Sequence, residues 1–284
     1  MTLEDIKKIG VIGAGVMGTG VAQRFAQYGY EIILVDVAEN ILESSKKTIE
    51  RNVMFHNMMN KEKLDQKAII ERIHTQTSYQ ALEDADIIIE NIPEIIEQKL
   101  NVYEQLTNIT KEECFYLVNT SCIPIKRIAD VVKQPEKVIG VHFMNPVPLQ
   151  NFAEVIKTSL ISEGSLNLIS EFLKQVKIDC TAVNDSPGFV SNRLSHLFMN
   201  EAANLVMEGI ATPEQVDMIF TRGFHHEIGP LYTADLIGID TVVNSLDVLY
   251  ECYKEDKYKC SQYMRDMVEN GELGRKTGKG FFKY

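Results

Sequence analysis

The chain has 284 residues, enough for about two domains by the usual rule of about 150 residues each, so it can bury a sizeable core. Its 40 acidic side chains outnumber 29 Lys and Arg, which gives a formal net charge of -11 and argues against partners such as nucleic acid or an anionic membrane surface. The apolar share of 45% is that of an ordinary globular protein. The sequence contains no run of 18 apolar residues, so no membrane-spanning helix is predicted.

The cysteines are odd in number and scattered, without a C-x-x-C pair. This pattern predicts neither a disulfide framework nor a zinc site, so we expect no metal and a reduced, cytoplasmic environment. The segment MTLEDIKKIGVIG carries acidic residues before a short apolar run, which is unlike a signal peptide.

Residues 8–35 predict a strand, a loop, a helix and a second strand. The stretch 8–12 is short, β-branched and followed at once by glycines. Met17, Val21 and Phe25 then recur at a spacing of four residues, which predicts a helix that ends near Gly29. A second strand is expected at 31–35, so the whole forms one βαβ unit.

Further buried strands are expected along the first half of the chain, at 86–91, 114–119, 137–143 and 152–156. Together they predict an α/β fold: a Rossmann-type, doubly wound parallel sheet with helices on both faces. Residues 40–74 depart from this alternation of strands and helices, because they have helical composition and no strand signal. We expect them to form a helical hairpin that protrudes from the sheet.

The strand pattern stops near Gly188, and helices are expected from there to the end of the chain. One apolar helix face is predicted from Leu194, Leu197, Phe198, Ala202 and Leu205, with Gly209 ending the helix. The segment 212–215 then resembles a capping box with proline at the first helical position. We therefore expect a Rossmann-like domain at 1–186 and an all-α domain at 187–284.

A glycine-rich loop, G-x-G-x-x-G, lies between the first strand and the first helix and consists of Gly13, Ala14, Gly15, Val16, Met17 and Gly18. In this position Gly13 permits the tight turn, Gly15 lets a pyrophosphate approach the backbone, and Gly18 packs the helix against the strand. Asp36 ends the second strand, where a carboxylate can accept hydrogen bonds from ribose hydroxyls. Because Asp36 would repel a 2′-phosphate and the neutral Val37 follows it, the pattern favours NAD over NADP.

His142 lies at the end of the strand expected at 137–143, and ligands of open α/β sheets bind at the carboxyl ends of the strands. Glu154 lies in the next expected strand, where its carboxylate can orient the imidazole and stabilise the imidazolium. Such a pair can act as a general base toward an alcohol. Asn119 and Ser121 follow another strand, and Asn192 begins the helical domain; these three residues are expected to converge with His142 on an interdomain cleft.

Six segments of the chain resemble the short-chain 3-hydroxyacyl-CoA dehydrogenase family in the same order and nearly from end to end: GVIGAGVMGTGVAQ, LVNTSC, VIGVHFMNPVP, DSPGFVSNR, IGPLYTADLIGIDT and GRKTGKGFFKY. The strings around HFMNP and PGFVSNR are more specific than the glycine loop. The resemblance implies reversible, NAD-linked oxidation of a 3-hydroxyacyl thioester to the 3-ketoacyl thioester. It also implies a homodimer that associates through the C-terminal helices.

The resemblance also implies roles for individual residues. His142 matches the catalytic base, Glu154 its orienting carboxylate, and Ser121 and Asn192 the groups near the substrate oxygen. The cofactor site would be lined by the glycine loop, Asp36 and three further residues: Glu94, Lys99 and Asn119. For Glu94 and Lys99, a plain solvated helical pair is the alternative interpretation.

Two departures from the family pattern leave alternatives open. Tyr232 brings aromatic bulk where the family commonly has glutamate, and the middle of the arm, 53–60, is rich in methionine where the family usually has basic residues that hold coenzyme A. Lys61 is retained and is expected to bind substrate. Since adaptable apolar surface also suits a protein ligand, the same chemistry on an acyl carrier protein, in polyketide extender-unit biosynthesis, is a second hypothesis. A nonenzymatic NAD-binding protein is a third.

Overall fold

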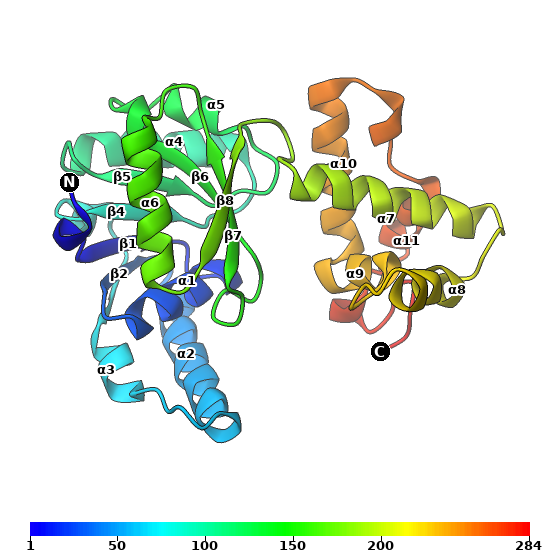
Figure 1. Cartoon of the computed structure of the whole chain (residues 1–284), viewed down its shortest axis with the longest axis horizontal. Helices are drawn as coiled ribbons and strands as arrows, with labels where there is room; N and C mark the ends of the chain where they lie inside the picture. Colours follow the sequence, from blue (N-terminus) through cyan, green and yellow to red (C-terminus); the bar gives the residue numbers. More distant parts are fainter. The chain divides into compact units, whose positions relative to one another are not determined.

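The computed structural model describes all residues, 1–284, and the chain forms two compact units, Met1–Asp185 and Ser186–Tyr284 (Figure 1). The first unit is an α/β structure built on one sheet. The second unit contains helices and no strand of the sheet. The expected fold class, a Rossmann-type domain followed by an all-α region, is therefore confirmed.

The sheet of the first unit has eight strands in the order β3-β2-β1-β4-β5-β6-β7-β8. Their bounds are β1 (Lys8–Ile12), β2 (Glu31–Val35), β3 (Ile73–Gln76), β4 (Ile87–Glu90), β5 (Phe115–Val118), β6 (Val138–Phe143), β7 (Phe152–Lys157) and β8 (Asp179–Asn184). The chain runs outward from β1 to one edge and then returns to extend the sheet from β4. The carboxyl ends of β1 and β4 therefore lie next to each other where the order reverses, which is where such folds bind ligands.

The expectation of an all-parallel first half is wrong at one place, because β6 and β7 pair antiparallel. Residues 144–151 connect them, and this loop is too short for the crossover of a dozen or more residues that a parallel pair requires. Every other pair of neighbouring strands is parallel. The reversal places His142 directly opposite Glu154 in the register of the two strands.

Helices cover both faces of the sheet, as expected. They are α1 (Val16–Gln27), α2 (Glu39–Met59), α3 (Gln66–Glu71), α4 (Ile96–Ile109), α5 (Ile125–Ala129) and α6 (Glu163–Gln175). On one face, Phe25 of α1 stacks on Phe172 of α6 with ring centroids 5.2 Å apart. On the other, Tyr103 of α4 meets Tyr116 of β5 edge to face at 5.8 Å. These apolar layers bury β4 and β5 completely.

The protruding arm is present but has unequal limbs, α2 of 21 residues and α3 of 6 residues (Figure 1). Its predicted end at residue 74 is too late, because Ile73 and His74 already belong to β3. This edge strand and β8 at the opposite edge carry no clear strand signal. Only Ile73 is buried in β3, and no residue of β8 is buried, so neither strand shows the apolar run or regular alternation that predicts one.

The second unit consists of α7 (Ser191–Met207), α8 (Pro213–Met218), α9 (Pro230–Ile237), α10 (Ile239–Tyr253) and α11 (Gln262–Glu269). The capping box of Thr212 and Gln215 at the start of α8 is confirmed. The apolar face expected for α7 is right only in part: Ala202 is buried, but Leu194 is 64% exposed, and Met199 and Ala203 are buried although they lie outside the predicted face. No helix of the chain combines the length and apolar character needed to cross a bilayer.

Candidate active site

The loop between β1 and α1 has the backbone geometry that its glycines predict. Gly13 has φ of +86°, and a Cβ atom there would lie 2.7 Å from the backbone oxygen of Asn91. A Cβ atom at Gly18 would lie 1.7 Å from the backbone oxygen of Gly13, so only glycine lets α1 begin this close to β1. At Gly15, by contrast, a Cβ atom would meet nothing within 4 Å. The loop therefore presents open backbone at Gly15, next to the N-terminus of α1, where a pyrophosphate can bind.

A cavity of about 910 Å³ adjoins this loop and has the size of a cofactor site. It brings together Gly13, Gly15, Val16, Met17 and Asp36, which the sequence analysis assigned to the cofactor. Its wall also contains residues that the sequence analysis missed: Ile41, Tyr79, Asn91, Ile92, Pro93, Glu97, Gln98, Asn101 and Val102. These residues come from four separate stretches of chain, and no local motif marks them. The open glycine backbone and the adjoining carboxylate of Asp36 fit a dinucleotide.

Asp36 is held in place at the end of β2. Its Oδ2 accepts a hydrogen bond from the backbone N–H of Ala14 at 2.8 Å, and its Oδ1 accepts one from Ala38 at 3.3 Å. Burial raises the pKa of the nearby Tyr79, and the charge of Asp36 raises it further. No Lys or Arg lines the cavity, and Val37 is 85% exposed. A 2′-phosphate would therefore meet a carboxylate with no cation to offset it.

Lys99 is fully buried, so its interpretation as part of a solvated helical pair is wrong. Its ammonium lies 2.7 and 2.9 Å from the two carboxylate oxygens of Glu90, at the end of β4, and neither side chain is exposed. It also donates to the backbone oxygen of Asn119 at 3.2 Å and lies 3.9 Å from Glu94. Glu90 was not predicted as a site residue, because nothing in the string DIIIEN distinguishes a buried carboxylate from a solvated one.

Glu94 fixes the loop that follows β5. Its Oε1 accepts three hydrogen bonds: from the hydroxyl of Thr120 at 2.5 Å and from the backbone N–H groups of Ser121 and Cys122, both at 2.9 Å. Asn119 connects the same loop to its neighbours. Its side-chain amide donates to Asn91 Oδ1 at 2.8 Å, and its Oδ1 accepts from the backbone N–H of Phe143 at 3.3 Å. The carboxyl ends of β4, β5 and β6 are thus joined by side chains.

His142 and Glu154 face each other across β6 and β7. His142 Nδ1 lies 3.5 Å from Glu154 Oε2, and the side chains are only 12% and 5% exposed. A carboxylate at Nδ1 favours the tautomer that leaves Nε2 unprotonated, so Nε2 can accept a proton from a substrate. Low exposure strengthens the interaction of the carboxylate with an imidazolium.

The candidate residues of the first unit gather at the carboxyl ends of β4, β5 and β6: Glu94, Lys99, Asn119, Ser121, His142 and Glu154. Asn192 belongs to the second unit, in the first turn of α7, where its backbone oxygen lies 2.9 Å from Nδ1 of His196. Lys61 is exposed in the connection between α2 and α3. It does not line the cavity beside the glycine loop.

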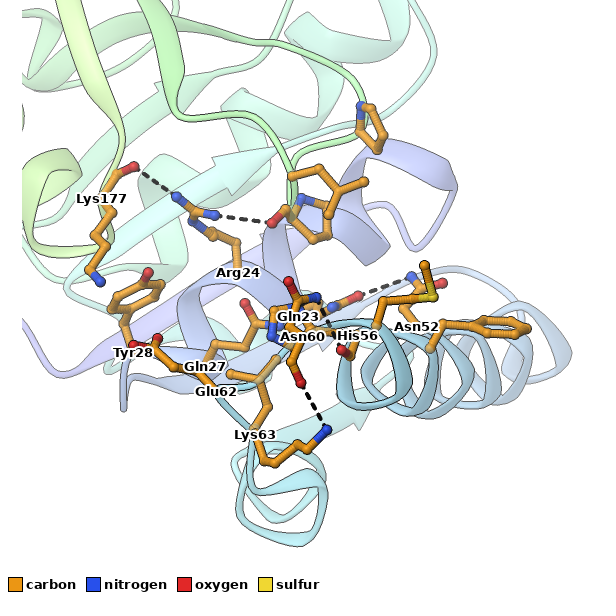
Figure 2. Close-up of a pocket in the computed structure, with 16 residues that line it drawn as sticks. Gln23, Arg24, Gln27, Tyr28, Asn52, His56, Asn60, Glu62, Lys63 and Lys177 are labelled. Atoms are coloured by element: carbon orange, nitrogen blue, oxygen red, sulfur yellow. Dashed lines mark hydrogen bonds between the residues drawn. The ribbon is translucent and has the colours of Figure 1, made fainter.

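A second cavity, of about 670 Å³, lies within the first unit between α1, the arm and the loop that follows β6 (Figure 2). Its wall combines apolar, amide and charged groups, including Asn52, Phe55 and Met59 of α2, Lys63 of the arm and Pro146 of the loop after β6. The guanidinium of Arg24 donates to the backbone oxygens of Val176, Lys177 and Pro148 and to the side chain of Asn151. Arg24 therefore anchors the loop that leads away from His142 to the body of the unit.

Family models, relatives and solved structures all place the chain in the same family. A family model described as 3-hydroxyacyl-CoA dehydrogenase, NAD binding domain, matches residues 8–186, and one described as 3-hydroxyacyl-CoA dehydrogenase, C-terminal domain, matches residues 188–284. The chain is similar to a Deinococcus radiodurans protein named "Probable 3-hydroxybutyryl-CoA dehydrogenase", with 40% identity covering 98% of this chain and 100% of that protein. Identity to the 3-hydroxybutyryl-CoA dehydrogenase of Clostridioides difficile is 35%, covering 98% and 99%. The crystal structure of (S)-3-hydroxybutyryl-CoA dehydrogenase from Ralstonia eutropha matches with a TM-score of 0.92 at 36% identity, covering 98% of this chain and 99% of that chain.

Proposed function

Because the chain belongs to the 3-hydroxyacyl-CoA dehydrogenase family, we propose that it catalyses the reversible, NAD-dependent oxidation of a short-chain (S)-3-hydroxyacyl-CoA, such as 3-hydroxybutyryl-CoA, to the 3-ketoacyl-CoA. The observation that carries this proposal is the buried pair of His142 and Glu154. It lies on the same sheet as β1, β2 and β4, whose carboxyl ends adjoin the cavity of about 910 Å³.

The chemistry of the chain's own residues follows from that pair. His142 Nε2 takes the proton of the substrate's 3-hydroxyl as C3 loses its hydride, and Glu154 stabilises the imidazolium that forms. NAD, when bound, supplies the acceptor for that hydride. In the reverse direction, the imidazolium of His142 returns the proton to the carbonyl oxygen. Glu154 keeps the ring in one orientation throughout, which favours proton transfer along a fixed path.

The cofactor would be held by the glycine loop and by the residues at the strand ends. The loop of Gly13, Gly15, Val16 and Met17 would receive the pyrophosphate, with Gly18 holding α1 against β1, and Asp36 would accept hydrogen bonds from the adenosine ribose. Toward the nicotinamide end, Glu94 and Asn119 are proposed to complete the site, and Lys99, whose side chain is fully buried against Glu90, would support them without touching the cofactor. Their support is the hydrogen-bonded network that joins the ends of β4, β5 and β6.

Substrate recognition is proposed for Ser121, Asn192 and Lys61. Ser121 lies in the loop that Glu94 fixes. Its hydroxyl would hold the substrate oxygen on which His142 acts. Asn192, in the second unit, would position the same centre. The carrier of the acyl group would follow the arm, where Lys61 is exposed.

The test is to mix the purified protein with acetoacetyl-CoA and NADH and to follow the loss of NADH absorbance. We expect turnover, with a strong preference for NADH over NADPH. The same acyl group on an acyl carrier protein serves as the comparison, and we expect a lower kcat/KM there. Coenzyme A is favoured because relatives that match over nearly the full length carry it in their names, and because an acidic carrier protein would be repelled by a chain of net charge -11. Absence of turnover with either carrier would contradict the proposal and favour a nonenzymatic role.

We also propose that two copies associate through the C-terminal helices. The support is an aromatic cluster on the second unit, made of Phe198, Phe220, Phe224 and His226. Phe224 is 64% exposed, and the neighbouring Met218 and Ile219 are 47% and 55% exposed. Contiguous exposed apolar surface of this kind marks protein interfaces. The cytoplasmic location expected from the scattered cysteines likewise stays a proposal.

A further inference from the structure

Glu90 and Lys99 form a fully buried ion pair at the carboxyl edge of the sheet. Both carboxylate oxygens of Glu90 contact the ammonium, and Oε1 also accepts from the backbone N–H of Ile92 at 2.6 Å. Burial raises the pKa of Glu90, while the positive charge of Lys99 opposes that rise. Such a pair seldom adds net stability over an apolar pair of similar volume, because both charges lose their hydration. A role in orienting neighbouring groups is therefore worth seeking.

Lys99 lies between two carboxylates that have different tasks. On one side is Glu90, at 2.7 Å; on the other is Glu94, at 3.9 Å. The same Glu94 accepts three hydrogen bonds from the loop 120–122. A buried ammonium without a counter-ion would approach the nearest remaining carboxylate, which is Glu94. Lys99 faces Oε2 of Glu94, whereas Oε1 holds the loop, so a closer approach to Lys99 would turn the carboxylate and weaken the three hydrogen bonds of Oε1.

We propose that Glu90 is a positioning residue for the dehydrogenase reaction: by neutralising Lys99, it leaves Glu94 available to hold the loop 120–122 and with it Ser121. This inference rests on the proposed function, because it assigns Ser121 to the substrate. Glu90 itself touches neither substrate nor cofactor. It acts through Lys99 and Glu94, over two contacts.

The test begins with Glu90→Gln in the full chain. We expect kcat for acetoacetyl-CoA reduction to fall about tenfold, a coupling of ordinary size for residues in one network. Amide hydrogen exchange in the loop 120–122 should become faster, because Ser121 and Cys122 lose their acceptor. Adding Lys99→Met removes the competing charge, so the double variant should recover most of kcat and the slow exchange. Recovery on removing a second residue is what distinguishes this role from simple support of the fold.

The same strand offers a matched control at its other end. Asp86, which precedes β4, pairs with Lys111 and accepts from the backbone N–H groups of Lys7 and Lys8 at 2.7 and 2.8 Å. This pair lies at the amino edge of the sheet, away from the candidate site. Asp86→Asn should lower Tm while kcat and exchange in the loop 120–122 stay as in the unmodified protein.

The outcomes separate the inference from the proposed function. No turnover by the unmodified protein would contradict the function, whereas the exchange of the loop 120–122 reports on Glu90 without any turnover. The inference is overturned if Glu90→Gln lowers only Tm, or if Lys99→Met in that background restores neither kcat nor slow exchange. Where Glu90→Gln does not fold, Glu90→Asp replaces it, because it keeps the charge but withdraws the carboxylate from Lys99. The same fall in kcat and faster loop exchange are expected, and unchanged values would overturn the inference.

Discussion

His142 lies opposite Glu154 because β6 and β7 pair antiparallel. Its role can be tested by substitution, with another histidine of the same sheet as the control. In His142→Gln the ring that accepts the proton is lost, so we expect kcat to fall by about 100-fold or more, the usual contribution of general acid–base catalysis, with a smaller change in KM. His74 is the control, because it also pairs with a glutamate, Glu31, at 3.0 Å, but both side chains are half exposed. Steady-state kinetics of His74→Gln should match the unmodified protein. A His142→Gln variant with normal kcat would remove His142 from the mechanism.

At the scale of single residues, the sequence revealed the groups that belong to local patterns and missed those that the fold brings together. His142 could be found because it ends an apolar strand, and Asp36 because it follows a glycine loop at a known distance. Tyr79 and Asn101 line the cofactor cavity from distant stretches, and no spacing indicates this. Glu90 was missed for a different reason: its pairing with Lys99 depends on burial, which composition does not show.

At the scale of elements, the turn between β1 and α1 and the end of β2 form one unit, because Asp36 accepts the N–H of Ala14. The variant Asp36→Ala with Val37→Arg removes the acceptor for the ribose hydroxyls and supplies a cation for a 2′-phosphate. We expect the ratio of kcat/KM for NADH over NADPH to narrow or invert. Val37→Arg alone is the control, since Asp36 should still disfavour the phosphate. Equal use of NADPH by the unmodified protein would contradict the role given to Asp36.

The central elements were predictable and the edge elements were not. The strands β1, β2, β4, β5 and β6 carry continuous apolar runs because both of their faces are covered, and a run of this kind is visible in the sequence. The direction of β7 was not visible, because it depends on the length of a loop and not on the strand itself. The apolar face of α7 was predicted only in part, because periodicity identifies a face but does not tell whether a domain core or another chain covers it.

At the scale of the whole molecule, net charge and exposed apolar surface act in opposite directions on association. Each copy carries a formal charge of -11, so two copies repel each other at long range, while the aromatic cluster of the second unit favours contact. Salt screens the repulsion over about 10 Å at 0.1 M and leaves the apolar contact intact. Dimerisation through the C-terminal helices should therefore strengthen as salt is raised.

Sedimentation equilibrium can test this association directly. We expect the unmodified protein, of 32.2 kDa per chain, to sediment as a dimer, and Phe224→Asp to shift it toward the monomer, because a carboxylate would be buried without a partner at the interface. Leu160→Asp is the matched control, since Leu160 is an exposed apolar residue of the first unit, at 45%. That variant should leave the dimer intact. If Phe224→Asp also remains dimeric at low protein concentration, the aromatic cluster is not the surface through which two copies meet.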